Sequence, residues 1–293
     1  MKLVETTNPR AHARSTTIWN EGTHQHELEL ARHLQFHLIG MYHAEVGPEW
    51  SSDGKLESDY LHHIDIPLSG HRQIVHNGRV VDLLPGRAYY LPGNTPVERR
   101  CSTTSQLLYL KIRCEWLRGI DPLMDRPERT PTPLGETNPE DWLHWHHNNP
   151  SINANHLLSL HAQVEIWMAA ILPDLDSLVS QHVKNHSTFK KVFAMVEDQL
   201  GANLKVSMLA KAYGTGLRAF SKAFTTDVGV SPKEFINRRL NQEAITLLLN
   251  DNLKIKEVAD QLEFANEFYF SRFFKKLNGV SPAQYRQRFR KGR

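Results

Sequence analysis

Apolar residues in the last third of the chain recur at intervals of three and four, the spacing that places them on one face of a helix. Two such stripes occur, one formed by Leu204, Met208, Leu209 and Ala212 and the other by Ile255, Val258, Ala259 and Leu262. Turn residues follow each stripe, and then a segment with an aromatic pair four residues apart, Phe220 with Phe224 and Phe270 with Phe274. The pattern predicts two copies of a helix, a tight turn and a second helix.

An internal repeat supports these two copies. Gly229-Val230-Ser231-Pro232 recurs 50 residues later as Gly279-Val280-Ser281-Pro282, whereas Leu209-Ala210 and Val258-Ala259 are 49 residues apart. Each glycine is expected to end its helix in a left-handed conformation, and Ser-Pro to begin the next helix. A longer amphipathic helix over 231–249 would then hold the two second helices at the fixed separation that grooves about 34 Å apart require.

Charge divides the chain in the same place. The net charge of +3 combines +9 from residue 186 onward, where 19 Lys and Arg oppose 10 Asp and Glu, with −6 before it. Only the C-terminal part therefore suits a polyanion. All 17 histidines, in contrast, lie at or before His186.

The order of motifs in the C-terminal part resembles the DNA-binding domain of AraC/XylS-type regulators. It runs from Leu-Ala and a tight turn, through Phe-x-x-x-Phe, Gly-x-Ser-Pro and a long helix, to Ile-x-x-Val-Ala, Phe-Ser-Arg-x-Phe-Lys-Lys and Gly-x-Ser-Pro-x-x-Tyr-Arg. The resemblance covers about 187–290 and implies a seven-helix domain with two helix-turn-helix units. It also implies activation of nearby promoters through contacts with RNA polymerase.

Carried over to this chain, the resemblance places recognition helices at about 216–226 and 266–277. The predicted DNA contacts are Arg218, Ser221, Lys222, Glu267, Phe268, Tyr269, Arg272, Lys275 and Lys276. Arg218 and Lys222 suit guanine edges, whereas Lys275 and Lys276 suit phosphate. For the two aromatic residues, core packing and DNA contact are both open.

Two positions depart from the family pattern. Gly216 stands where the family places a capping serine, so that either Thr215 caps the helix or its start is looser. Glu263 stands where the family has the turn glycine, which Gly214 provides in the first copy. A left-handed residue other than glycine costs roughly 1–2 kcal/mol, so either the second unit is weaker or its turn is altered.

Residues 32–118 alternate in the manner of strands and predict a small all-β barrel or sandwich. Turn signals recur about every eight residues, and Asn77-Gly78 between two valine-rich runs indicates a two-residue hairpin. The turn spacing of 67–93 resembles the cupin-like ligand-binding domain common in the same family. A small-molecule effector would enter that barrel, and the candidate ligand-binding residues are His43, His62, Arg72, His76 and Tyr90.

A metal site is not expected, although the part before residue 186 is rich in histidine. His24 and His26 precede the recognisable barrel and lack the glutamate spacing of cupin enzymes, while His62 and His63 would point to opposite faces of a strand. We therefore predict neither a metal nor another cofactor, and no catalytic residue.

Between the barrel and the repeat, residues 121–140 are rich in proline, threonine and charged residues and indicate a linker or a long excursion rather than a regular element. A helix from about Asn153 follows, with an apolar seam formed by Leu157, Leu160, Val164, Trp167, Met168 and Ile171. This seam would pack either on the barrel or on a second subunit, as in the dimers of the resembled family.

The predicted protein has three parts: a cupin-like sensor domain with an N-terminal arm (1–118), a linker with a helical, dimerising segment (119–185), and an all-α DNA-binding domain (186–293). The sequence shows neither a secretory signal nor an apolar run long enough for a membrane helix, so a cytoplasmic, non-membrane protein is expected. Cys101 and Cys114 are accordingly expected to be buried or half-buried reduced thiols.

The predicted function is ligand-responsive, sequence-specific binding of double-stranded promoter DNA by a homodimer. It would activate a nearby metabolic operon, with carbohydrate metabolism suggested by the family alone. Two alternatives remain open at this point: a cupin-type metal-dependent enzyme fused to a DNA-binding tail, and a constitutive regulator whose barrel only dimerises.

Overall fold

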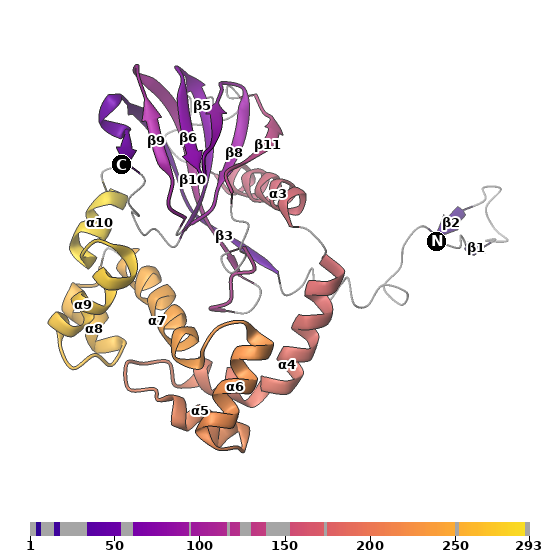
Figure 1. Cartoon of the computed structure of the whole chain (residues 1–293), viewed down its shortest axis with the longest axis vertical. Coiled ribbons are helices and arrows are strands. Elements are labelled where there is room, and N and C mark those ends of the chain that lie inside the picture. Colours follow the sequence, from indigo (N-terminus) through magenta and orange to yellow (C-terminus); the bar gives the residue numbers. More distant parts are fainter. Residues whose placement is uncertain are drawn as a thin grey trace.

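The chain consists of an N-terminal sheet-rich region followed by a C-terminal helical domain (Figure 1). The computed structural model describes residues 4–6, 15–17, 34–53, 61–93, 95–115, 118–123, 130–138, 153–172, 175–249 and 252–290. His24 and His26 lie outside these residues.

Two antiparallel sheets form most of the N-terminal region that the structure describes. The larger has the order β11-β8-β5-β10-β3, formed by β3 (Gln35–Val46), β5 (His62–Ser69), β8 (Arg87–Leu91), β10 (Ser105–Glu115) and β11 (Thr132–Glu136). The smaller has the order β4-β9-β6-β7, formed by β4 (Ser52–Asp53), β6 (Arg72–His76), β7 (Arg79–Leu83) and β9 (Glu98–Cys101). A short 3-10 helix, η1 (Pro48–Trp50), precedes β4, and the strands β1 (Val4–Thr6) and β2 (Ser15–Thr17) pair with each other in a separate two-stranded sheet.

The predicted all-β character of this region is therefore present, but a closed cupin-like barrel is not confirmed. In the part of the chain that the structure describes, each sheet has two edge strands, β11 and β3 in one and β4 and β7 in the other. The hairpin predicted at Asn77-Gly78 is confirmed: His76 pairs with Arg79, and both turn residues have positive φ, 50° and 76°. This is the backbone that a two-residue primed turn requires.

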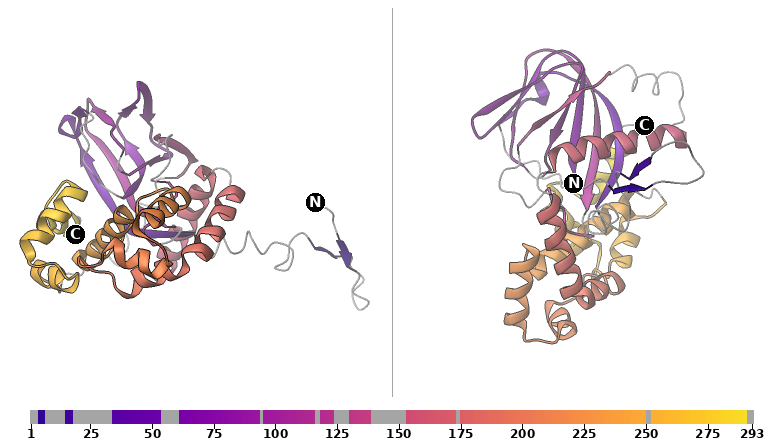
Figure 2. Two further views of the ribbon diagram at one scale, coloured as in Figure 1. Left: turned by 60° about the horizontal axis from the view of Figure 1, so that its bottom comes forward. Right: turned by 90° about the vertical axis from the view of Figure 1, so that its right-hand side faces the viewer.

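The helix α3 (Ala154–Ile171) covers the larger sheet (Figure 2). Its buried residues Leu160, Val164, Trp167 and Met168 belong to the same hydrophobic core as the strand residues Ile64, Leu110 and Ile112. Of the two predicted placements of the apolar seam, packing on the sheet is the one observed. Leu157, at 46% exposure, lies outside it.

The segment predicted as a linker contains structure. Thr132–Glu136 form the edge strand β11, which pairs with β8, and Leu123 is buried in the core beneath the larger sheet. Pro133 is tolerated because an edge strand leaves one side of its backbone without a sheet partner. The proline and threonine content predicts no strand in this segment, but residues 132–136 form one because they pair with β8.

The helical domain is built from α4 to α10 around two aromatic cores. The helices are α4 (Leu175–Asp198), α5 (Val206–Tyr213), α6 (Leu217–Val228), α7 (Pro232–Leu249), α8 (Ile255–Gln261), α9 (Glu267–Asn278) and α10 (Pro282–Arg290). The first core contains Phe189, Phe220 and Phe224, and the second contains Phe270, Phe274 and Tyr285. Because α7 supplies Phe235 to the first core and Leu240 to the second, one rigid helix joins them.

The expected domain boundary at residue 186 falls inside α4, which continues through it and departs from helical geometry at Phe189. Cys101 and Cys114 are both buried and unpaired, as predicted, and burial raises the pKa of the Cys114 thiol well above its usual value. Among the described residues, no helix is long and apolar enough to cross a membrane.

Candidate nucleic-acid interface

The first repeat forms a helix-turn-helix from α5, a three-residue turn and α6. Gly214 ends α5 with a left-handed φ of 87°, and its N–H donates to the carbonyls of Ala210 and Lys211. The next N–H, of Thr215, donates to the Ala210 carbonyl as well, at 3.2 Å. These bonds close the tight turn. In the first repeat, a glycine occupies the position at which the backbone requires a positive φ.

The second repeat forms the same turn without a glycine. Glu263 takes a left-handed φ of 58°, its N–H donates to Asp260, and the N–H of Phe264 donates to Ala259. These bonds correspond at an offset of 49 residues to those of the first turn, as the repeat predicted. Of the two possibilities for the second unit, an altered turn is thus not observed, and Glu263 itself takes the left-handed conformation.

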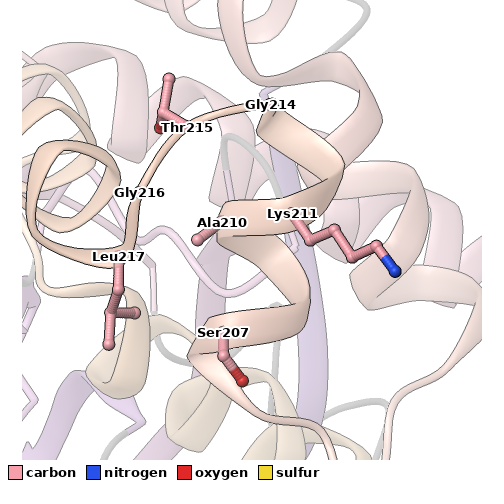
Figure 3. Close-up of a pocket in the computed structure, with 7 residues that line it drawn as sticks. All are labelled: Ser207, Ala210, Lys211, Gly214, Thr215, Gly216 and Leu217. Carbon is pink, nitrogen blue, oxygen red and sulfur yellow. The ribbon is translucent and has the colours of Figure 1, made fainter.

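The two recognition helices differ at their N-termini. The Asn266 side chain accepts hydrogen bonds from the N–H groups of Phe268 and Tyr269, at 3.0 and 3.1 Å, and so caps α9 as expected. At α6 the capping position is Gly216, without a side-chain hydrogen bond. Of the two possibilities for this helix, capping by Thr215 is therefore not observed, and the start of α6 lacks a side-chain cap. A shallow groove lined by Lys211, Thr215 and Leu217 lies beside it (Figure 3).

Both recognition helices end as the repeated Gly-Val-Ser-Pro motif predicts. Gly229 and Gly279 have φ of 87° and 73°, and their N–H groups donate to the carbonyls four residues before. Ser231 and Ser281 accept hydrogen bonds from the N–H groups of Glu234 and Gln284 at the starts of α7 and α10. The motif thus fixes how each recognition helix is connected to the helix behind it.

Most of the predicted DNA contacts lie on the solvent-exposed side of α6 and α9. The exposed members are Arg218, Lys222, Glu267, Phe268, Tyr269, Arg272, Lys275 and Lys276, while Ser221 is half-buried. In each helix the exposed residues lie opposite an inward pair, Phe220 with Phe224 and Phe270 with Phe274, which are fully buried. The inward aromatic spacing therefore leaves the basic positions free to face a ligand; that the ligand is DNA stays a prediction for each residue.

A family model described as a helix-turn-helix domain matches residues 209–288, which contain both turns and both recognition helices. The C-terminal domain is an AraC/XylS-type helix-turn-helix domain.

Curated relatives match over part of the chain. The chain is 27% identical over 130 residues to the virulence regulon transcriptional activator VirF of Yersinia enterocolitica, which is 44% of each protein. It is 29% identical over 113 residues to the transcriptional regulator ExsA of Pseudomonas aeruginosa, 39% of this chain and 38% of ExsA. The matched parts thus span less than half the length of these relatives. Among solved structures, ToxT of Vibrio cholerae with a bound unsaturated fatty acid has a TM-score of 0.47 at 16% identity, covering 86% of this chain and 94% of ToxT.

Two polar contacts that sequence reasoning missed fix the AraC/XylS-type domain from within. Arg239 of α7, 4% exposed, donates from Nε to Glu197 Oε1 at 3.0 Å and from Nη2 to Glu197 Oε2 at 3.1 Å. Asn241 and Asn278 exchange side-chain hydrogen bonds of 3.2 and 2.6 Å between α7 and the end of α9. Each pair joins residues about forty positions apart, so no local pattern signals it.

Of the five predicted effector-binding residues, the structure brings His62 and Tyr90 into direct contact, and the other three lie apart from this pair. His62, Arg72 and Tyr90 are buried, whereas His43 is exposed on β3 and His76 donates from Nδ1 to the Pro96 carbonyl. The Gly93 N–H and the Tyr90 hydroxyl both donate to His62 Nδ1, which leaves the proton on Nε2 to bind Asp121 Oδ2 at 2.8 Å. Among the described residues, no group of three His, Cys, Asp or Glu side chains is arranged to hold a metal ion.

Proposed function

We propose that this chain is a sequence-specific DNA-binding regulator of transcription that recognises double-stranded promoter DNA. The observation that carries the proposal is the pair of exposed recognition helices, α6 and α9, joined through the single helix α7. Two helices held in this way suit successive major-groove segments on one face of a duplex. The net charge of +9 from residue 186 onward supports a polyanionic partner.

Footprinting of the full chain on DNA around its own gene and on a genomic library tests this function. We expect a protected segment long enough for two major-groove contacts, and loss of protection when Arg218 and Lys222 are both replaced by alanine. A matched control is Arg238→Ala. Arg238 lies on α7, not on a recognition helix, and its side chain is bound to Glu234 of the same helix. Failure of the unaltered chain to protect any segment would refute the proposal.

Activation is the expected output, since VirF is named a transcriptional activator. Contact with RNA polymerase and control of a nearby metabolic operon belong to the same proposal. A reporter fused to the protected promoter measures the direction of control directly.

We also propose that a small-molecule effector binds within the sheet-rich region, which would then act as a cupin-like sensor. Arg72 of β6 is fully buried and donates from Nη1 to Asp65 Oδ2 at 3.2 Å, while the ring of Trp50 lies 4.8 Å from its guanidinium carbon. Its Nε and Nη2 have no hydrogen-bond partner among the described residues. Unpaired buried donors are costly, and a polar effector would satisfy them.

Dimerisation through α3 is the remaining part of the proposal. The side of α3 away from the sheet presents Leu158 at 70% and Ile166 at 64% exposure, with the exposed Ala162 between them. This apolar face suits the same face of a second copy. Light scattering of the Leu158→Lys, Ile166→Lys double variant should show a smaller mass than the unaltered chain.

A further inference from the structure

The two recognition helices present different chemistry to a ligand at equivalent positions. At an offset of 50 residues, Arg218 of α6 corresponds to Phe268 of α9, and Ala219 corresponds to Tyr269. The two aromatic side chains are 64% and 56% exposed. The second helix therefore carries a large apolar surface where the first carries a cation.

These two rings are not needed for the core behind them. The second core is already filled from the same helix by Phe270 and Phe274, which are fully buried, and Phe264 and Phe273 pack against its edge. Phe268 and Tyr269 instead contact each other edge to face, with ring centroids 6.1 Å apart. Large apolar groups left exposed in this way mark binding surfaces. Of the two possibilities open from the sequence, core packing is thus not the one observed.

The local structure fixes the backbone that carries the two rings. The Asn266 cap binds the backbone N–H groups of both residues, which fixes the first turn of α9. One turn further on, the Arg272 guanidinium carbon lies 5.7 Å from the centre of the Phe268 ring. The N-terminal turn of a recognition helix is where base edges are contacted, so the aromatic surface lies where sequence is read.

We propose that Phe268 and Tyr269 contact the C5-methyl groups of thymines in the major groove of the second half-site. This inference rests on the proposed DNA-binding function and names the chemistry that the second unit reads. Ring carbons make no hydrogen bonds to phosphate or to the polar edges of guanine, whereas apolar contact with the thymine methyl is an established way to distinguish that base. Lys275 and Lys276, in the last turn of α9, supply the phosphate contacts.

The first unit reads different bases, because Arg218 and Lys222 suit the acceptors of guanine. The bound DNA therefore contains two unlike half-sites, one with guanine facing α6 and one with thymine facing α9. This asymmetry also fixes the orientation of each protein molecule on the duplex.

Replacement of single thymines by deoxyuridine tests the inference, because it removes the methyl group and leaves every hydrogen-bonding atom in place. In a footprinted segment bound by the full chain, we expect deoxyuridine at one or two positions of one half-site to lower affinity about fourfold per contacted methyl, the effect of losing the burial of one CH2-sized group. In the Phe268→Ala, Tyr269→Ala double variant, the affinities for thymine and deoxyuridine DNA should become equal. Both side chains are exposed, so a thermal midpoint close to that of the unaltered chain is expected and is measured alongside.

Arg218→Ala is the matched control. It should retain the sensitivity to deoxyuridine but lose the sensitivity to 7-deazaguanine, which removes the guanine N7 acceptor, in the other half-site. Equal affinity of the unaltered chain for thymine and deoxyuridine DNA overturns the inference and leaves the proposed function standing. Unchanged DNA affinity in the aromatic double variant, combined with reduced promoter activity, also overturns it and assigns the two rings to a protein partner. Failure of the unaltered chain to bind any DNA refutes the proposed function itself.

Discussion

Ile120 and Leu123 are three positions apart in the chain, yet they pack in the cores of two different domains. Ile120 contacts the first aromatic core of the AraC/XylS-type domain, and Leu123, 4% exposed, lies in the core beneath the larger sheet. Residues 118–123, the bridging segment, therefore tie the two domains together by direct packing rather than as a free linker.

Polar contacts at both ends fix the bridging segment. Asp121 accepts from His62 Nε2 through Oδ2 and from the Leu123 N–H through Oδ1, both at 2.8 Å. At the other end, Arg118 donates to Glu197, which also binds Arg239. Because Glu197 also binds Arg239 of α7, the bridging segment is linked through Glu197 to the helix that connects the two helix-turn-helix units.

We predict that Gly119→Ala weakens the link between the domains. Gly119 has a φ of 90°, and an added Cβ would lie 2.5 Å from the Arg239 side chain and 3.1 Å from the Phe235 ring. The left-handed backbone alone costs an alanine roughly 1–2 kcal/mol, and the close contact adds to it. Calorimetry should show a lower midpoint, or two separate unfolding transitions in place of one.

Gly86→Ala provides the matched control for this variant. Gly86 has a similar φ of 79°, but nothing lies within 4 Å of an added Cβ. It should show the backbone cost without separation of the transitions. Equal behaviour of the two variants would contradict the role given to the contact with Arg239.

The buried His62–Asp121 pair is predicted to contribute more to stability than an exposed pair of the same length. Asp121→Asn leaves the His62 Nε2–H facing an uncharged group and should lower the free energy of unfolding by about 1–3 kcal/mol. Asp82 pairs with His71 at the same 2.8 Å, but both side chains are about half exposed. Chemical denaturation of Asp82→Asn should therefore show a smaller change in the free energy of unfolding than Asp121→Asn, and a larger effect at Asp82 would refute the argument.

The two turns predict opposite responses to exchange of their left-handed residues. Glu263 has a φ of 58°, a left-handed conformation that costs a residue other than glycine about 1–2 kcal/mol. Glu263→Gly removes this cost, but glycine also has more conformational freedom in the unfolded chain. The second unit should therefore be more stable by about 1 kcal/mol. Gly214→Ala should destabilise the first unit by a similar amount, and open space around its Cβ leaves the backbone as the cause. Hydrogen exchange of the two variants under increasing denaturant, followed separately in each helix-turn-helix unit, shows whether the stability of that unit rises or falls.

Local chemistry explains what the sequence predicted well. The repeated Gly-Val-Ser-Pro, the Asn77-Gly78 hairpin and the Asn266 cap each depend on residues close together in the chain, and each occurs as predicted. The left-handed Glu263 was also predictable, because the repeat aligned it with Gly214.

Contacts between distant residues explain what the sequence did not predict. Arg239 follows another arginine in an amphipathic helix and has the sequence context of a solvent-exposed residue, but Glu197, 42 positions away, makes its burial favourable. The bridging segment and β11 lie in a stretch whose composition indicates a linker, and only their packing against other elements orders them. Polarity marks the candidate effector residues in the sequence, but polarity does not show whether a buried group such as His62 is already paired within the protein.

The last prediction separates base contacts from phosphate contacts within the AraC/XylS-type domain. Arg218→Ala should cost about 1–3 kcal/mol of binding free energy on DNA with the preferred base and almost nothing on DNA altered at that one position. Lys275→Ala, in the last turn of α9, should weaken binding to all sequences alike and reduce the slope of log affinity against log salt by about 0.9. Titration of each variant with single-base-altered duplexes at several salt concentrations checks both. Uniform weakening by Arg218→Ala would show instead that Arg218 binds phosphate, so that specificity in the first half-site would have to come from other residues of α6 such as Lys222.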